Sequence, residues 1–147
     1  MVFKLSDKIS IRLIHTPGHT LESSCYSLEE NINGKNKVIC LFTGDTLFKG
    51  EVGRPDLAVK SNLTSKDLSL MLYDSLEKIK KLPDDVIIFP GHGSGSECGK
   101  SIQSGNYTTI DHEKKFNYAF KCKKDEFSEN VLSNMPTPPR YFFHDAM

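Results

Sequence analysis

The sequence predicts an α/β protein built from alternating strands and helices. Residues 8–14 alternate apolar and polar side chains, with Ile9, Ile11 and Leu13 apolar, which is typical of a strand with one buried face. Residues 38–42 form a continuous apolar run, typical of a strand buried on both faces, and residues 86–89 form a shorter one. Apolar side chains at helical spacing over residues 64–82 lie between these two runs. This alternation favours layers of helices packed on a sheet.

The other elements follow from turn and capping signals. Pro17 and Gly18 end the first strand, a second strand is expected over residues 24–28, and Asn33-Gly34 predicts a hairpin. Residues 43–62 show no sustained period and predict a long loop of the kind that is usually functional or disordered. Residues 64–67 match a capping box at the start of the main helix.

The C-terminal third is expected to be helical and then rich in proline. Residues 83–85 end the main helix, and helices are expected over about 109–121 and 124–132. Prolines at 136, 138 and 139 indicate a linker or domain edge. The predicted organisation is therefore one domain over residues 1–135, with a tail over residues 136–147.

Composition excludes several classes of partner. The chain has 147 residues, with 19 Lys+Arg against 19 Asp+Glu, and no basic stripe that would favour nucleic acid or an acidic membrane. No apolar run approaches the ~20 residues of a membrane span. Four cysteines without a C-x-x-C pair are expected to be reduced thiols, Cys25 and Cys40 in the core. We therefore expect a cytoplasmic protein.

Three expected strand ends each carry one potential metal ligand. His19 follows the first strand, Asp45 follows the run at 38–42, and His92 follows the run at 86–89. Loops at strand ends are where a rigid sheet presents ligands. Two imidazoles and a carboxylate suit zinc or non-heme iron better than calcium or magnesium.

The strings around these ligands resemble three motifs of the metallo-β-lactamase fold superfamily. They are HTPGHT at 15–20, FTGDTLF at 42–48 and FPGHG at 89–93, in that order. The resemblance implies an αββα sandwich with His19, Asp45 and His92 as metal ligands, Asp45 bridging in dinuclear members, and His15 ordering its loop. The superfamily's first motif, H-x-H-x-D-H, is absent, because no two of the five histidines are separated by a single residue. The resemblance therefore covers the C-terminal half of the sandwich, with the first half missing or encoded elsewhere.

A finer resemblance points to the persulfide dioxygenases, especially those fused to rhodanese domains. Four segments carry it, namely GRPDL at 53–57 and residues 92–100, 108–120 and 138–142. It implies oxidation of a low-molecular-weight persulfide, such as glutathione persulfide, to sulfite and thiol at a mononuclear Fe(2+) site. His19 and Asp45 would supply two members of the facial triad and the missing half the third, with His92 near the substrate. The implied partners are that N-terminal half or a rhodanese domain.

Other residues near these motifs leave alternatives open. Arg54 either pairs with Asp56 to fix the ligand loop or binds a substrate carboxylate, and we favour the first. Cys98, six positions after His92, is either a sulfur relay or a bystander. His112 is expected at the surface among charged residues, and His144 has no identifiable partner.

Two other functions compete with the dioxygenase. A glyoxalase II-like hydrolase would use Zn(2+) to attack a glutathione thioester, and it shares residues 44–48. Against it, the chain after His92 does not resemble the helical glutathione-binding domain of those hydrolases. The third alternative is a non-catalytic fragment that exposes the apolar face of residues 38–42.

Overall fold

The computed structural model describes residues 1–138, so the tail at 139–147, which includes His144, lies outside the described residues. Strands and helices alternate as predicted, which confirms the α/β class. The strands are Val2–Lys4 (β1), Ile9–His15 (β2), Ser24–Ile32 (β3), Lys35–Gly44 (β4), Leu47–Phe48 (β5), Glu51–Val52 (β6), Ile87–Pro90 (β7) and Thr108–Thr109 (β8). The helices are Ser65–Lys80 (α1), Ile110–Phe116 (α2), Tyr118–Lys121 (α3) and Lys124–Leu132 (α4).

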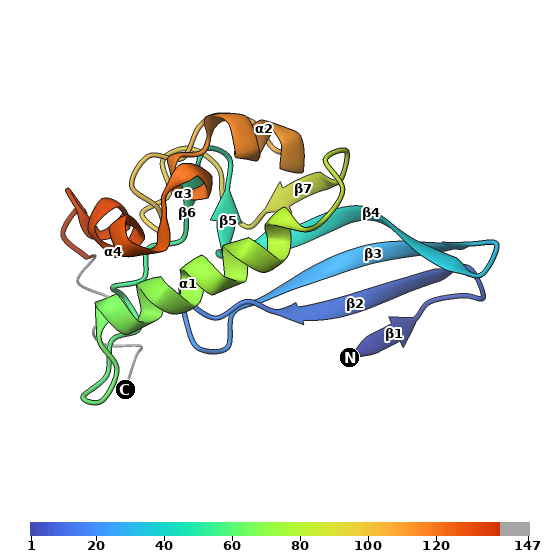
Figure 1. The fold of residues 1–147 in the computed structure, drawn as a ribbon, viewed down its shortest axis with the longest axis horizontal. Coiled ribbons are helices and arrows are strands. Elements are labelled where there is room, and N and C mark those ends of the chain that lie inside the picture. Colours follow the sequence, from blue (N-terminus) through green and yellow to red (C-terminus); the bar gives the residue numbers. More distant parts are fainter. Residues whose placement is uncertain (139–147) are drawn as a thin grey trace.

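One six-stranded sheet organises the fold, in the order β1-β2-β3-β4-β7-β8 (Figure 1). Strands β1 to β4 pair antiparallel, and the β3–β4 hairpin turns at Asn33 and Gly34, both with the positive φ that such turns need. Helix α1 connects β4 to β7, which pair in parallel. Strands β2, β4 and β7 therefore run in the same direction and end at the same edge of the sheet.

Helix α1 covers one face of this sheet. The capping box is confirmed, because Thr64 accepts from the backbone N–H of Asp67 and the Asp67 carboxylate accepts from the backbone of Thr64. The buried side of α1 packs with the sheet in a single core, which includes Leu72, Leu76 and Ile79 from the helix and Cys25, Leu41 and Ile88 from the strands. Cys40 is buried as well, so both predicted core cysteines are confirmed.

The opposite face of the sheet is open within residues 1–138. Tyr26, Phe42 and Phe89 lie in register on β3, β4 and β7, and their exposed fractions are 41%, 43% and 37%. The prediction that residues 38–42 are buried on both faces is therefore wrong at Phe42, and the run at 86–89 is fully buried only at Val86 and Ile88. The apolar residues of 8–14 are only partly buried for the same reason.

Two predicted segments differ in detail. The helix expected over 109–121 is interrupted at Asn117, whose side chain accepts from the backbone of Ala119 and donates to Glu51 and Glu113. The loop expected over 43–62 contains the β5–β6 hairpin, with Leu47, Phe48 and Val52 fully buried. Helix α4 has the predicted bounds. No helix within residues 1–138 has the length and apolarity that crossing a membrane requires.

Candidate metal centre

The common direction of β2, β4 and β7 brings the three predicted ligands together at one edge of the sheet. The Nε2 atom of His19 lies 3.5 Å from Oδ2 of Asp45, and the Nε2 atom of His92 lies 3.2 Å from Oδ1 of the same carboxylate. Each oxygen of Asp45 thus faces a different imidazole. The site has a buried side and an exposed side. The side chain of His19 is 8% exposed, whereas that of His92 is 43% exposed.

His19 is held in the orientation that a metal ligand needs. Its Nδ1 lies 2.9 Å from the carbonyl oxygen of Arg54. A carbonyl can only accept, so Nδ1 carries a proton and donates it, and Nε2 is the ring nitrogen that faces Asp45. A hydrogen bond from the outer ring nitrogen to a backbone carbonyl is the usual support of a ligating histidine.

Two glycines let the backbone approach Asp45 closely. A Cβ atom on Gly53 would overlap the carbonyl oxygen of Asp45, and one on Gly91 would lie 2.7 Å from Asp45 Oδ1. The backbone N–H of Gly91 also donates to the carbonyl of Gly44 at 2.8 Å. The loops that carry Asp45 and His92 are therefore packed backbone to backbone, which limits how far either ligand can move.

Helix α1 fixes the loop that carries His19. Gly18 presses directly against the backbone and Cβ of Leu72, where any larger residue would overlap the helix. Ser75 donates to the carbonyl of Pro17 at 2.8 Å. On the other side of the loop, Nε2 of His15 donates to the carbonyl of Leu21 at 2.8 Å. The loop-ordering role that the resemblance implies for His15 would use this contact and stays a prediction.

Arg54 uses its side chain within the protein. It is fully buried, and its Nε and Nη2 donate to the two carboxylate oxygens of Asp56 at 2.7 Å each. Its guanidinium also donates to the carbonyls of Pro136 and Glu97, at 2.6 and 3.4 Å. The structure thus forms the Arg54–Asp56 pair that we favoured over a substrate contact. The backbone carbonyl of Arg54 accepts from His19, so this pair fixes the residue that orients a predicted ligand.

Cys98 lies at the same centre. One ligand atom each from His19, Asp45 and Cys98 falls within 4.8 Å of the others. Burial raises the pKa of the Cys98 thiol above its ordinary value, a hydrogen bond with Ser96 lowers it, and the Asp45 carboxylate raises it further. The neutral thiol is therefore favoured at neutral pH. Whether Cys98 relays sulfur stays a prediction.

Sequence reasoning missed the buried polar groups that support the centre. The hydroxyls of Thr16 and Thr46, 2.9 Å apart, join the loops of His19 and Asp45. The buried carboxylate of Glu113 accepts from the backbone of Gly50 and from the side chains of Thr108 and Asn117. Only the position of Thr16 and Thr46 inside the two motif strings signalled such a role.

The comparisons with known proteins bear on this geometry. A family model described as the metallo-beta-lactamase superfamily matches residues 6–92, which is more than half of the chain. The chain belongs to this superfamily. Among solved structures, the metallo-beta-lactamase from Staphylococcus aureus subsp. aureus COL is similar, with a TM-score of 0.84, 34% identity, and coverage of 98% of this chain and 40% of that one.

Two further relatives point to different branches of the superfamily. ETHE1 from Myxococcus xanthus superposes with a TM-score of 0.70 and 25% identity, covering 99% of this chain and 54% of that one. The hydroxyacylglutathione hydrolase GloC of Haemophilus influenzae is 33% identical over 111 residues, which is 76% of this chain and 41% of the relative. The chain thus spans about two fifths of the length of the curated relatives it matches.

The residues present fit the metal ions that this superfamily binds. Two imidazole nitrogens, one of them oriented by a backbone carbonyl, face a carboxylate in a cradle that two glycines leave open. This donor set suits zinc or iron.

Proposed function

We propose that this chain carries part of the iron site of a persulfide dioxygenase, which oxidises a low-molecular-weight persulfide such as glutathione persulfide to sulfite and thiol. The observation that carries the proposal is the loop at 53–57. The backbone carbonyl of Arg54 accepts a hydrogen bond from His19, and the side chain of Arg54 pairs with Asp56. This loop carries the resemblance to the dioxygenases, and the fold likeness to ETHE1, of the persulfide dioxygenase branch, supports the same reading.

Each residue has a definable task in that reaction. An iron ion bound here would supply the position at which dioxygen and the persulfide sulfur react, and the reaction consumes one O₂ and one water for each sulfite and thiol formed. His19 and Asp45 would hold the ion, and the carbonyl of Arg54 fixes the ring of His19 by a hydrogen bond. Asp45 contributes a negative charge that the neutral imidazoles lack. His92 lies on the exposed side, its ring 6.0 Å from that of Phe48, where it would contact the substrate.

The proposal is tested by oxygen uptake. The purified chain is loaded anaerobically with iron(II), glutathione persulfide is added, and oxygen consumption and sulfite are followed. We expect iron-dependent uptake that His19→Ala abolishes, with the third iron ligand supplied from elsewhere in this chain or by a second copy of it. Glu22→Ala is the control, because Glu22 lies in the loop after the same string and its side chain is exposed. Absence of uptake in an iron-loaded, folded chain, or equal loss in both variants, would contradict the proposal for this chain.

A second function is supported by a different observation. Each oxygen of Asp45 faces a separate imidazole, the arrangement expected of a carboxylate that bridges two ions. A zinc-dependent thioester hydrolase related to hydroxyacylglutathione hydrolases would use such a pair. Zinc stoichiometry separates the two functions. For the hydrolase, we expect His92→Ala to lower bound zinc from two ions to one and to stop cleavage of a glutathione thioester, whereas the proposed mononuclear iron site does not use His92 as a ligand.

A further inference from the structure

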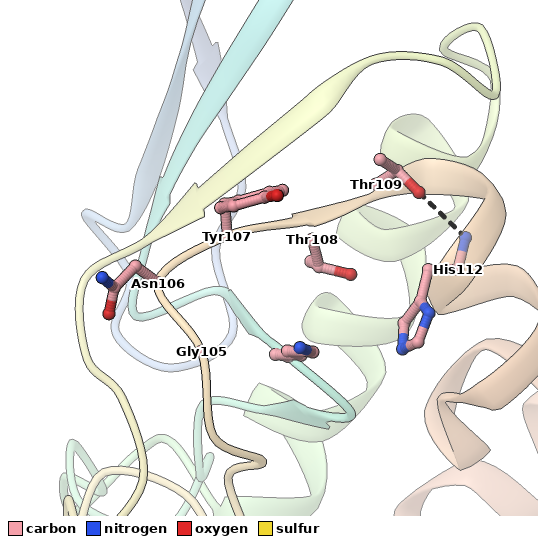
Figure 2. A pocket seen from close by; sticks show the side chains of 7 residues that line it. Gly105, Asn106, Tyr107, Thr108, Thr109 and His112 are labelled. Atoms are coloured by element: carbon pink, nitrogen blue, oxygen red, sulfur yellow. Dashed lines mark hydrogen bonds between the residues drawn. The ribbon is translucent and has the colours of Figure 1, made fainter.

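A polar pocket of about 290 Å³ lies beside the metal centre, and we call it the Lys49 pocket. It is lined by Lys49, Gly105, Asn106, Tyr107, Thr108, Thr109 and His112. Figure 2 shows the segment at 105–109 and the His112 side chain of α2 around it. None of the roles derived above for the metal centre uses this pocket.

The Lys49 pocket adjoins the metal centre. Gly105 and Asn106 also line a neighbouring pocket of about 240 Å³ whose other lining residues are Pro90, Gly91, His92 and Gly93. The two pockets therefore share a wall, and the second contains a predicted metal ligand. A molecule with one end at His92 can extend past Asn106 toward Lys49. Together the pockets have the size of a small-molecule site.

The ammonium group of Lys49 has no counter-charge in the described chain. No carboxylate of residues 1–138 lies within ion-pair distance of its Nζ. A Cβ on Gly105 would lie 2.8 Å from this Nζ, so the glycine provides the space that the ammonium uses. The buried Glu113 is already satisfied by three donors of the protein. The positive charge of Lys49 is thus available to an incoming anion.

The rest of the pocket wall includes polar groups of Tyr107, Thr109 and His112. Tyr107 is 60% exposed at the pocket, and Thr109 Oγ1 accepts from the backbone N–H of His112 at 3.2 Å (Figure 2). Nε2 of His112 is buried with no hydrogen-bond partner among the described residues. The sequence-based placement of His112 at the surface is therefore wrong for this atom, since the ring packs against Phe116 with 4.8 Å between ring centres.

We infer that the Lys49 pocket binds the anionic end, a carboxylate or a phosphate, of the small thiol compound whose sulfur reacts at the metal centre. This inference rests on the proposed function for the identity of the reacting sulfur. The substrate class is thereby narrowed to thiols that carry an anionic group at a distance from the sulfur. Lys49 determines specificity for that end, since a charge-assisted hydrogen bond is stronger than a neutral one.

The test measures binding with ligands that cannot react. The affinity of the chain for S-methylglutathione is measured by calorimetry and compared with that for the same compound with both carboxylates converted to amides. S-methyl phosphopantetheine provides the phosphate arm. The variants are Lys49→Gln, Lys49→Arg as the conservative replacement, and Lys60→Gln as a matched control at an exposed lysine outside the pocket.

We expect Lys49→Gln to weaken binding of one anionic ligand about tenfold. Lys49→Arg and Lys60→Gln should bind that ligand with an affinity close to that of the wild type. The amide form should bind all three variants and the wild type with the same affinity. The ligand that shows this dependence identifies the anion as carboxylate or phosphate. Equal affinity in wild type and Lys49→Gln, or no binding of either anionic ligand, overturns the inference. These ligands are inert, so binding and oxygen uptake are tested independently. If binding depends on Lys49 but the chain takes up no oxygen, only the dioxygenase proposal is contradicted. If the chain takes up oxygen but binding does not depend on Lys49, only the inference about the pocket is contradicted.

Discussion

Gly91 and Gly93 flank His92 and give a matched pair of substitutions. A methyl group on Gly91 would lie 2.7 Å from Asp45 Oδ1 and against the backbone of Gly44, whereas one on Gly93 would meet nothing within 4 Å. We expect Gly91→Ala to lower zinc or iron affinity by about ten- to a hundredfold, because it displaces a ligand from its supported position. Gly93→Ala should keep wild-type affinity. Metal titration of both variants checks this, and equal affinities would show that Gly91 does not constrain Asp45.

The Arg54–Asp56 pair gives a stability prediction at the same scale. Asp56→Ala leaves a fully buried guanidinium without its carboxylate, so we expect the free energy of unfolding to fall by about 3 kcal/mol. The control is Asp84→Ala, which breaks an exposed pair with Lys114 and should cost less than about 1 kcal/mol. Urea denaturation of the two variants compares them. A small loss for Asp56→Ala would mean that carbonyls such as that of Pro136 suffice for Arg54.

Single residues differ in how far the sequence reveals them. His19, Asp45 and His92 were predictable because each lies in a distinctive string after a strand. The place of Lys49 in a pocket was not predictable, because it depends on Gly105, which lies more than fifty positions away in the chain. A residue whose role is set by a distant neighbour leaves no local signal.

Among the elements, the β2–β3 pair predicts a pH dependence. Arg12 on β2 donates to Glu29 on β3 at 2.7 Å, and this contact lowers the pKa of Glu29 below its ordinary value of 4.5. A carboxyl whose pKa is lower in the folded state stabilises the fold above its unfolded pKa and loses that contribution as the pH falls through the folded pKa.

The corresponding measurement is the free energy of unfolding against pH. We expect wild type to be more stable than Glu29→Gln near neutral pH, with the difference shrinking as the pH falls below about 4.5. Glu22→Gln, at an exposed position, should follow the wild-type curve. A difference between wild type and Glu29→Gln that does not change with pH would contradict the ion pair as its source.

Helices show why some elements are predictable. The start of α1 was predicted correctly because its capping box is made of residues three positions apart, Thr64 and Asp67. The break between α2 and α3 was missed because Asn117 is held by Glu51, 66 positions away, as well as by Glu113. Local signals fix where a helix begins, whereas tertiary hydrogen bonds decided where this one is interrupted.

For the whole molecule, periodicity predicts which residues share a face but not what covers that face. The alternation over β2 placed Ile9, Ile11 and Leu13 together, yet only Ile14, on the other face, packs against the core under α1. The period of a strand is a local property, whereas coverage depends on every other layer of the fold. The resemblance to half of a sandwich raised an uncovered face at residues 38–42 as one alternative, and the structure shows that Tyr26, Phe42 and Phe89 form it.

That open face gives a prediction for the chain in solution. Phe42 and Phe89 stack with their ring centres 5.7 Å apart beside the exposed Tyr26, which makes a contiguous apolar patch. Such patches bind hydrophobic dyes, whereas apolar side chains exposed singly do not. We expect the chain to enhance the fluorescence of anilinonaphthalene sulfonate. The double variant Phe42→Ser/Phe89→Ser should reduce this enhancement severalfold while unfolding stays cooperative.

The control Val59→Ser/Phe116→Ser removes two side chains that are more exposed but separate from the sheet, and it should leave the enhancement unchanged. Equal loss in both double variants would show that the dye senses general exposure instead of this face.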